Sequence, residues 1–310
     1  MRYLESISQF SALQMIRMNI RNDYDCFRVC LRAPRLWNAS LHALGKHQIN
    51  LRPGITHFSG SITCLEDLHF LSKLPNLRRC QLEANLAEKE APVVTVAHLT
   101  HLYADIHALE VLSAPLLGSL VVHLRTRRMR IGPRLNFPQE TLIRFLHRSK
   151  CHLESLSVSE DLFTSDPATG ISILEACSTI SRLKLELTMR RGNFGIVEAL
   201  TSPSVLPNLQ HLILLMPPSA GDQWNAILRM ARSRRDAGML NLVEIQFSCL
   251  STVGEQRYGA RLVGGMRLQI GALTQDDFEM RIVKWLPSFE DPVSLEHLFG
   301  GPGDIFTLLM

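Results

Sequence analysis

A short pattern of apolar and polar positions recurs along most of the chain. It reads apolar-x-x-apolar-x-apolar, where x is most often polar, and several copies begin two residues after a proline. Leu77, Cys80 and Leu82 form a clear copy that follows Pro75. Ten copies are present, beginning at Leu13, Leu36, Ile55, Leu77, Leu99, Leu117, Leu153, Ile180, Leu209 and Leu242. Their starts lie 18 to 36 residues apart, and a leucine-rich repeat has a period of about 20 to 29 residues, so the pattern predicts a repeat protein.

Each copy is predicted to form a short β-strand, because alternate side chains of a strand point to opposite faces. The fourth and sixth positions then share one face and are buried, although Gly60 holds the sixth position in one copy. The third and fifth positions share the other face. One unit cannot bury its apolar face alone, so we expect neighbouring units to stack into a parallel sheet with the connectors on its buried face.

The connectors between the strands carry helical spacing. The clearest helix is predicted over residues 222–236, where apolar side chains recur at i, i+3, i+4 and i+7. Asp222 is expected to cap this helix and Gly238 to end it. Further helices are predicted over residues 64–74, 141–150, 171–177 and 195–200. The fold class expected is therefore α/β, an irregular leucine-rich-repeat solenoid over residues 1–272 with a C-terminal cap or tail over residues 273–310.

The last part of the chain departs from the repeat. Residues 266–270 alternate apolar and polar side chains and indicate an eleventh strand with a different lead-in. Residues 276–280 and 282–286 are predicted to form a helix over the last unit, because an open end of a solenoid exposes core. Many leucine-rich repeats place Asn three residues after the last apolar position, and here only Asn85 stands there. We therefore expect irregular repeats.

Six runs of residues give a more specific signal, and two of them share the motif Leu-Pro-Asn-Leu, at 74–77 and 206–209. The runs span residues 55–60, 64–68, 74–83, 145–156, 206–212 and 228–235. Together they resemble the leucine-rich-repeat region of basidiomycete (mushroom) F-box proteins over about residues 13–270. In that family an N-terminal F-box binds the adaptor of an SCF-type ubiquitin ligase, and the repeats bind the substrate.

The resemblance implies the substrate receptor of a ubiquitin ligase acting in ubiquitin-dependent protein degradation. The chain departs from the family at its start, because no Leu-Pro-x-Glu opening of an F-box is present and the first repeat begins at Leu13. No adaptor-contact residue is carried over. The chain is then a fragment, a divergent copy, or a protein that has lost the link to the ligase. An SCF adaptor is an expected partner only if an F-box exists upstream.

The third and fifth positions of the units are expected to form a concave face that meets a partner. Among these twenty positions four are Arg or Lys, three are His and one is acidic, a stronger basic bias than in the whole chain. The candidate partner-binding residues are Arg17, Asn38, His57, Arg79, Gln81, His101, Tyr103, Arg182, Lys184, His211 and Glu244. The hypothesis is a protein partner with an acidic or phosphorylated segment. The alternative is a solvated face without a ligand.

Composition narrows the class of protein. The 310 residues are 46% hydrophobic and carry a net charge of only +4, which excludes disorder for most of the chain. The longest aliphatic run, Leu212 to Met216, has five residues, whereas a membrane-spanning helix needs about 20. The first ten residues contain no apolar segment of a secretory signal. Seven cysteines without a Cys-x-x-Cys pair are interpreted as reduced core thiols, so a cytoplasmic or nuclear protein is expected.

Arginine supplies 27 of the 33 basic residues, and two clusters stand out, at residues 125–134 and 232–235. Arginine suits two-pronged contacts with phosphate or carboxylate groups. Each cluster is therefore either a solvated face or an anion-binding surface. The alternative function is non-specific nucleic-acid or phosphate binding through the loop from Arg125 to Arg134.

Patterns typical of catalysis are missing from the sequence. There is no His-Glu-x-x-His, no glycine-rich phosphate loop followed by Lys and Ser or Thr, and no Gly-x-Ser-x-Gly. His98 and His101 flank Leu99 in a predicted strand and are expected on opposite faces. We therefore expect no enzyme, no catalytic residues, no cofactor and no metal site. The predicted function is that of a protein-interaction module.

Overall fold

A computed structural model shows that the chain folds into two compact units. The first contains the described residues up to His152, and the second contains those from Leu153 to Val283. The residues that the structure describes are 12–19, 28–30, 34–42, 48–51, 53–62, 65–84, 92–124, 138–163, 167–187, 195–216, 224–247, 266, 269–271, 273 and 278–283.

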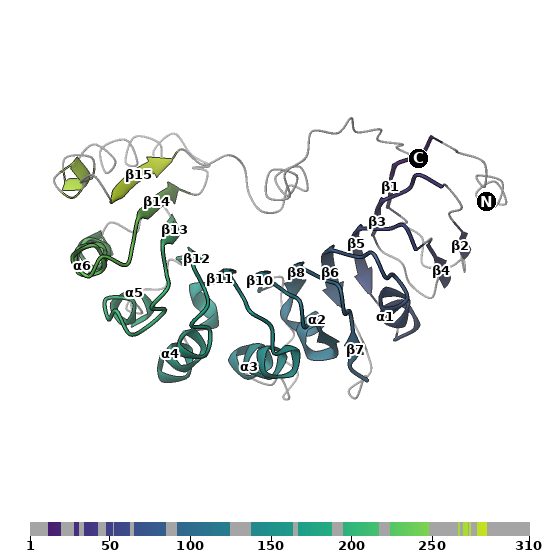
Figure 1. The fold of residues 1–310 in the computed structure, drawn as a ribbon, viewed down its shortest axis with the longest axis horizontal. Coiled ribbons are helices and arrows are strands. Elements are labelled where there is room, and N and C mark those ends of the chain that lie inside the picture. Colours follow the sequence, from purple (N-terminus) through teal and green to yellow (C-terminus); the bar gives the residue numbers. More distant parts are fainter. Residues whose placement is uncertain are drawn as a thin grey trace. The chain divides into compact units, whose positions relative to one another are not determined.

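The first unit contains a parallel sheet with helices on one side of it (Figure 1). Its strands, in order across the sheet, are β1 (Met15–Asn19), β3 (Asn38–His42), β5 (His57–Ile62), β6 (Arg79–Ala84), β8 (His101–Asp105) and β10 (Ser119–His123). The helices are α1 (Leu65–Ser72), α2 (Ile106–Val111) and α3 (Pro138–Ser149). Two short parallel pairs join connectors, β2 (Arg28–Cys30) with β4 (Gln48–Asn50) and β7 (Val94–Thr95) with β9 (Leu112–Ser113).

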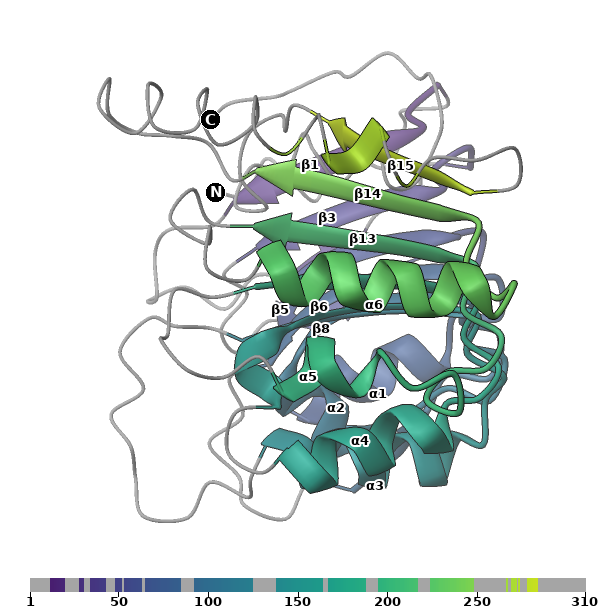
Figure 2. The same cartoon turned by 90° about the vertical axis from the view of Figure 1, so that its left-hand side faces the viewer.

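The second unit repeats this arrangement. Its parallel strands, in order, are β11 (Ser155–Ser159), β12 (Arg182–Glu186), β13 (His211–Met216), β14 (Leu242–Phe247) and β15 (Glu279–Val283). The helices α4 (Pro167–Ala176), α5 (Gly195–Ala199) and α6 (Trp224–Asp236) connect them, with a 3-10 turn at Glu160–Leu162 after β11. Figure 2 shows α5 and α6 lying alongside the strands. The chain is thus α/β with parallel strands, as predicted.

The core of each unit lies between its sheet and its helices. In the second unit one ladder of facing residues runs Val158, Leu185, Leu214 and Ile245, and all four are buried. In the first unit the matching ladder contains Gly60, whose neighbour Phe58 places its ring where a larger sixth residue would lie. The apolar period of two therefore sets which face of every strand is buried.

All ten predicted strands are present, but the last copy has a different register. Val243 faces Leu212, and Ile245 faces Leu214. The fourth position of this copy is therefore Val243 and not Ile245, because the copy begins at Leu240. The error is two residues, so Glu244 stays on the face that was predicted for it.

The connector helices are confirmed over 64–74, 141–150, 171–177, 195–200 and 222–236, with ends that differ by a few residues. Asp222 lies outside the described residues. Gly238 ends α6 as predicted, with φ at +68°. Its amide donates to the carbonyl of Arg235, and the next amide, of Met239, donates to that of Arg234, which together form a Schellman motif. The short helix α2 was not predicted, and it begins where Asp105 Oδ1 accepts from the Ala108 amide at 2.9 Å.

The last part of the chain corrects two predictions. Met266 and residues 269–271 are helical and not part of a strand. Met266 and Ile270 are both buried, and a spacing of four places them on one helical face. The helix predicted over 276–286 is wrong for 279–283, which form β15 parallel to β14. Residues 284–286 lie outside the described part. The division at residue 272 stays a prediction.

Candidate partner-binding surface

Along each strand, every second side chain points away from the helices. These side chains form the surface that we call the polar sheet face. In the first unit it contains the predicted residues Arg17, Asn38, His57, Arg79, Gln81, His101 and Tyr103. In the second unit it contains Arg182, Lys184, His211 and Glu244. All of them lie on the face that was predicted for them. Their role in binding stays a prediction.

Three of these residues form a row across the first unit. Arg79 faces His57 on one side and His101 on the other. Neighbouring strands of a sheet lie about 4.8 Å apart, so the guanidinium stem of Arg79 stands between two imidazoles. We call this set the His–Arg–His row.

A threonine orients each imidazole of the row. Thr56 Oγ1 donates to the carbonyl of Trp37 at 3.3 Å and lies 2.8 Å from Nδ1 of His57. Thr100 Oγ1 donates to the carbonyl of Arg78 at 3.0 Å and lies 2.9 Å from Nδ1 of His101. In the tautomer that satisfies both contacts, the hydroxyl hydrogen is used on the carbonyl and the hydroxyl oxygen accepts from Nδ1–H, so Nε2 carries no hydrogen in the neutral ring.

Both imidazoles of the row are neutral near pH 7. Burial, followed by the charge of Arg79 and the proximity of His101, lowers the pKa of His57 to about 4. Burial and the charge of Arg79 also lower the pKa of His101. The row therefore carries one permanent positive charge and two rings that resist protonation.

These shifts predict a loss of stability in acid. Above the unfolded-state pKa of 6.5, neither state protonates His57, and the ring adds no pH dependence. As the pH falls from 6.5 to about 4, His57 becomes protonated in the unfolded chain but stays neutral in the folded chain. The free energy of unfolding should therefore fall in this window, and less so in His57→Gln. Urea denaturation near pH 7 and near pH 5 measures this difference. An equal fall in both proteins would contradict the prediction.

Two residues further along the same three strands, Ser59, Gln81 and Tyr103 form a second row on the polar sheet face. Ser59 Oγ donates to Gln81 Oε1 at 3.0 Å across β5 and β6. Tyr103 is only 6% exposed, and its ring stacks on His123 with centroids 6.2 Å apart. Tyr103 therefore offers little surface to a partner, although it lies on the predicted face.

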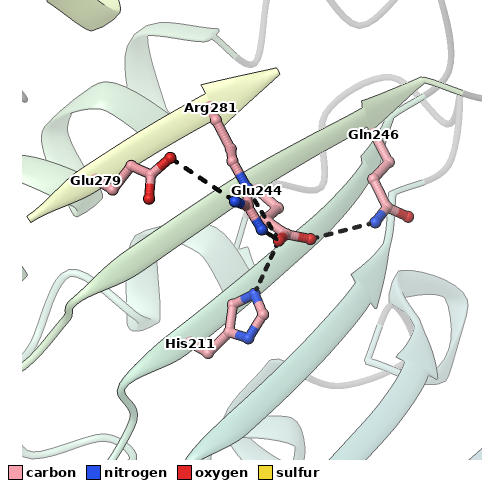
Figure 3. Close-up of polar contacts among 5 residues, drawn as sticks. All are labelled: His211, Glu244, Gln246, Glu279 and Arg281. Atoms are coloured by element: carbon pink, nitrogen blue, oxygen red, sulfur yellow. Dashed lines mark hydrogen bonds and ion pairs between the residues drawn. The ribbon is translucent and has the colours of Figure 1, made fainter. Parts of the chain in front are cut away.

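In the second unit a carboxylate is held by its own neighbours (Figure 3). Glu244 is 8% exposed. Arg281 donates to Glu244 Oε1 from Nε at 3.1 Å and again from a terminal nitrogen, and Gln246 donates to Oε2 at 3.4 Å. His211 Nε2 lies 3.6 Å from Oε1. Burial raises the pKa of Glu244, but the hydrogen bond and charge of Arg281 outweigh it, so the pKa lies below its usual value.

Arg281 is the residue of this cluster that the sequence did not reveal, because a helix was expected there. Its guanidinium neutralises the one acidic candidate, Glu244. Arg182 and Lys184 lie on β12 of the same unit. Burial lowers the pKa of Lys184 to about 8, with further effects from Glu186, Arg182 and Glu244, so its ammonium is still largely charged near pH 7. On β12 the face of the second unit therefore carries Arg182 and Lys184 together with the carboxylate of Glu186.

The arginine clusters fare differently. The cluster at 125–134 lies outside the described residues, and its predicted role stays a prediction. In the cluster at 232–235, Arg234 is fully buried and is neither a solvated nor an anion-binding residue. It donates to four backbone carbonyls, those of Leu200, Ser202, Val205 and Leu206. Arg234 is therefore a structural residue of the core.

The sequence also predicts that the protein has no metal site, no membrane-spanning helix and no reactive thiol. Within the described residues, no three His, Cys, Asp or Glu side chains come together so as to hold a metal ion. No described helix combines the length and apolar character needed to cross a membrane. Among the described cysteines, Cys80 and Cys177 are buried free thiols, as predicted for core cysteines, whereas the free thiol of Cys151 is only half-buried. The absence of enzymatic activity and of a cofactor stays a prediction.

Comparison with known proteins adds no assignment. The chain matches no family model, no curated protein and no solved structure. Function must therefore be inferred from the residues of the polar sheet face.

Proposed function

We propose that the chain is an irregular leucine-rich-repeat solenoid whose polar sheet face binds an acidic or phosphorylated segment of a protein partner. Strands that recur in parallel with helical connectors support the repeat type. The observation that carries the binding role is the His–Arg–His row, because a permanent positive charge stands between two oriented imidazoles on a sheet face. Arg and aromatic rings are side chains that often carry interface energy.

The cationic side chains of the face, and not its net charge, support an anionic partner, because Glu186 lies on β12 beside Arg182 and Lys184. Arg182 and Lys184 extend the cationic positions to the second unit, while the carboxylate of Glu244 is already neutralised by Arg281. Charged groups of one sign attract a partner of the other sign and speed its association. The proposed partner therefore presents carboxylates or phosphates.

The decisive experiment reverses charges on this face. Arg79→Glu combined with Arg182→Glu should weaken capture of the partner at least about tenfold, because like charges would then meet across the interface. The matched control is Arg144→Glu with Arg229→Glu, which makes the same change of net charge on exposed helical residues, with side chains 56% and 65% exposed. Quantitative affinity capture measures both double variants against the unchanged chain.

Two outcomes separate the alternatives. Loss of capture in the sheet variant alone supports the proposal, and phosphatase treatment of the partner then tells phosphate from carboxylate recognition. If both double variants capture the partner as well as the unchanged chain does, the proposal is wrong and the polar sheet face is a solvated surface.

The resemblance to basidiomycete F-box proteins extends the proposal to substrate recognition in an SCF-type ubiquitin ligase. In that role the bound partner is a substrate, and the ligase adaptor binds through an F-box outside the repeats. The captured partner should then accumulate when the proteasome is inhibited, and it should do so less in cells that carry the Arg79→Glu, Arg182→Glu variant. Partner levels that ignore the variant would remove the ligase role and keep the binding role.

A further inference from the structure

The His–Arg–His row has the geometry of a site for one small anion. His57, Arg79 and His101 occupy the same register position on three adjacent strands. With strands about 4.8 Å apart, the Cα atoms of the two histidines lie about 10 Å from each other, with Arg79 between them. A tetrahedral oxyanion is small enough to lie over Arg79 within reach of both rings.

The two imidazoles are oriented in the same way by a repeated Thr-His pair. Thr56 and Thr100 each hold the Nδ1 edge of the following histidine, at 2.8 and 2.9 Å. This leaves Nε2 as the atom that changes role, an acceptor in the neutral ring and a donor in the protonated ring. The rings of Trp37 and His57 also pack edge to face, with centroids 4.9 Å apart, which further restricts the His57 ring.

The other charged or titratable groups on this face occupy other register positions. The Cα atom of Glu83 lies four residues along β6 from that of Arg79, about 13 Å by strand geometry, and its carboxylate accepts from Ser61 Oγ. Asp105 caps α2 from a buried position. Arg17, on β1, is two strands from His57, and the Tyr103 and His123 rings stack on each other. Within the described residues, no carboxylate therefore shares the register position of the row.

We propose that the His–Arg–His row binds the phosphate group of a phosphorylated partner segment and takes up protons on His57 and His101 as it does so. This inference rests on the proposed function, because it names the group that the polar sheet face recognises. Arg79 supplies the permanent charge, and each protonated imidazole adds an Nε2–H donor to the same anion.

The direction of the pH dependence follows from the charges. In the free protein, burial and the charge of Arg79 oppose protonation of both rings. A bound dianion reverses the sign of the nearest charge and favours the protonated rings. For an anion of constant charge such as sulfate, proton uptake on binding makes the affinity rise as the pH falls. We expect sulfate to bind about tenfold tighter near pH 5.5 than near pH 7.5, with reciprocal shifts in the pKa of both rings. A phosphomonoester loses its second charge below a pKa of about 6, which opposes this rise.

The test follows the two imidazoles by NMR while sulfate is added. Sulfate is a fully dianionic tetrahedral probe in this range, so its own charge does not change. The expected result is a rise in the pKa of His57 and of His101 as sulfate saturates. Arg79→Gln should abolish the sulfate-dependent rise, while raising the sulfate-free pKa of both rings because one repelling charge is gone. Arg229→Gln, at an exposed position of α6, is the control and should leave the rise intact.

Each outcome decides the matter. The absence of any sulfate-dependent shift, or a shift of equal size in Arg79→Gln, would overturn the inference and show an adventitious ion only. A second arm compares a phosphoserine peptide with the same peptide carrying serine, and equal binding of the two would also overturn it. If the sulfate linkage holds while the charge-reversed protein still captures its partner, the proposed function fails and the anion site stands. If capture depends on Arg79 without any proton linkage, only this inference fails.

Discussion

Replacing Arg234 with alanine is expected to lower the free energy of unfolding by about 3 kcal/mol. The side chain is fully buried and donates from Nη1 to the Leu206 carbonyl at 3.1 Å and from Nη2 to the Ser202 carbonyl at 3.0 Å. Nε and Nη2 also donate to the carbonyls of Leu200 and Val205. Removing it leaves four carbonyls without this donor, and each unsatisfied buried group costs about 1–3 kcal/mol.

Two effects limit the size of this loss. Burial lowers the pKa of Arg234 to about 10, so the folded protein already bears a desolvation cost that the variant removes. Water can also enter the space and satisfy some carbonyls. The connector still needs support from α6, because Leu206 adopts φ +54°, a left-handed conformation that is unfavourable for a leucine. The net estimate of about 3 kcal/mol reflects these opposing effects.

The measurement is urea denaturation near pH 7, with two comparison variants. Arg232→Ala removes an exposed arginine from the same helix and should change the free energy of unfolding by less than about 0.5 kcal/mol. Arg234→Lys keeps the charge but not the five donors, so it should cost nearly as much as alanine. A loss below about 1 kcal/mol in Arg234→Ala would show that the four hydrogen bonds contribute little.

Replacing Gly60 with alanine is expected to destabilise the first unit by about 2 kcal/mol. A Cβ atom at this position would lie 2.6 Å from the Leu41 carbonyl oxygen and 2.9 Å from the Phe58 ring. The carbonyl belongs to the neighbouring strand β3 and cannot move without straining the parallel ladder. Gly60→Leu restores the apolar sixth position of the repeat and should nevertheless cost more than alanine.

Gly118→Ala is the matched control for this prediction. The nearest atom to a Cβ at Gly118 is the Thr100 carbonyl oxygen at 3.9 Å, an ordinary contact. That variant should be neutral or stabilise the protein by up to about 1 kcal/mol, because alanine reduces the freedom of the unfolded chain. Thermal or urea unfolding of the two alanine variants measures the contrast. Similar values for both would contradict the steric explanation.

The strands were predictable because two independent requirements agree on them. The local period of two assigns each side chain to a face, and the repetition of the pattern requires parallel neighbours. Where either requirement leaves a choice, the prediction fails. Apolar residues occur at Leu240, Leu242, Val243, Ile245 and Phe247, which fit two frames. Only pairing with β13 selects the frame that buries Val243 and Ile245.

The end of the chain shows the limit of reading local periods. Met266 and Ile270 satisfy the period of a strand and also the spacing of a helix, and tertiary packing selects the helix. Met280 and Ile282 alternate with Glu279 and Arg281, and the open edge of β14 selects the strand. In both places the neighbour in space decides and not the sequence alone.

The candidate surface was predictable in outline but not in its bonds. Parity alone places His57, Arg79 and His101 on one face. The hydroxyl contacts of Thr56 and Thr100 depend on distances across and along strands that no pattern encodes. The sequence of an arginine cluster does not show which of its members are buried. The buried role of Arg234 was therefore not predicted.

The residue-for-residue register of the ladders has a consequence for insertions and deletions. Within each unit, facing residues of neighbouring strands occupy equivalent positions. Deleting one residue inside β6 would reverse the face of every strand residue on one side of the deletion, turning polar side chains toward the core and apolar ones outward. Deleting two residues would keep every side chain on its face. Insertions and deletions of any number of residues should therefore be tolerated in the loops between strands. Inside a strand, only those of an even number of residues should be tolerated.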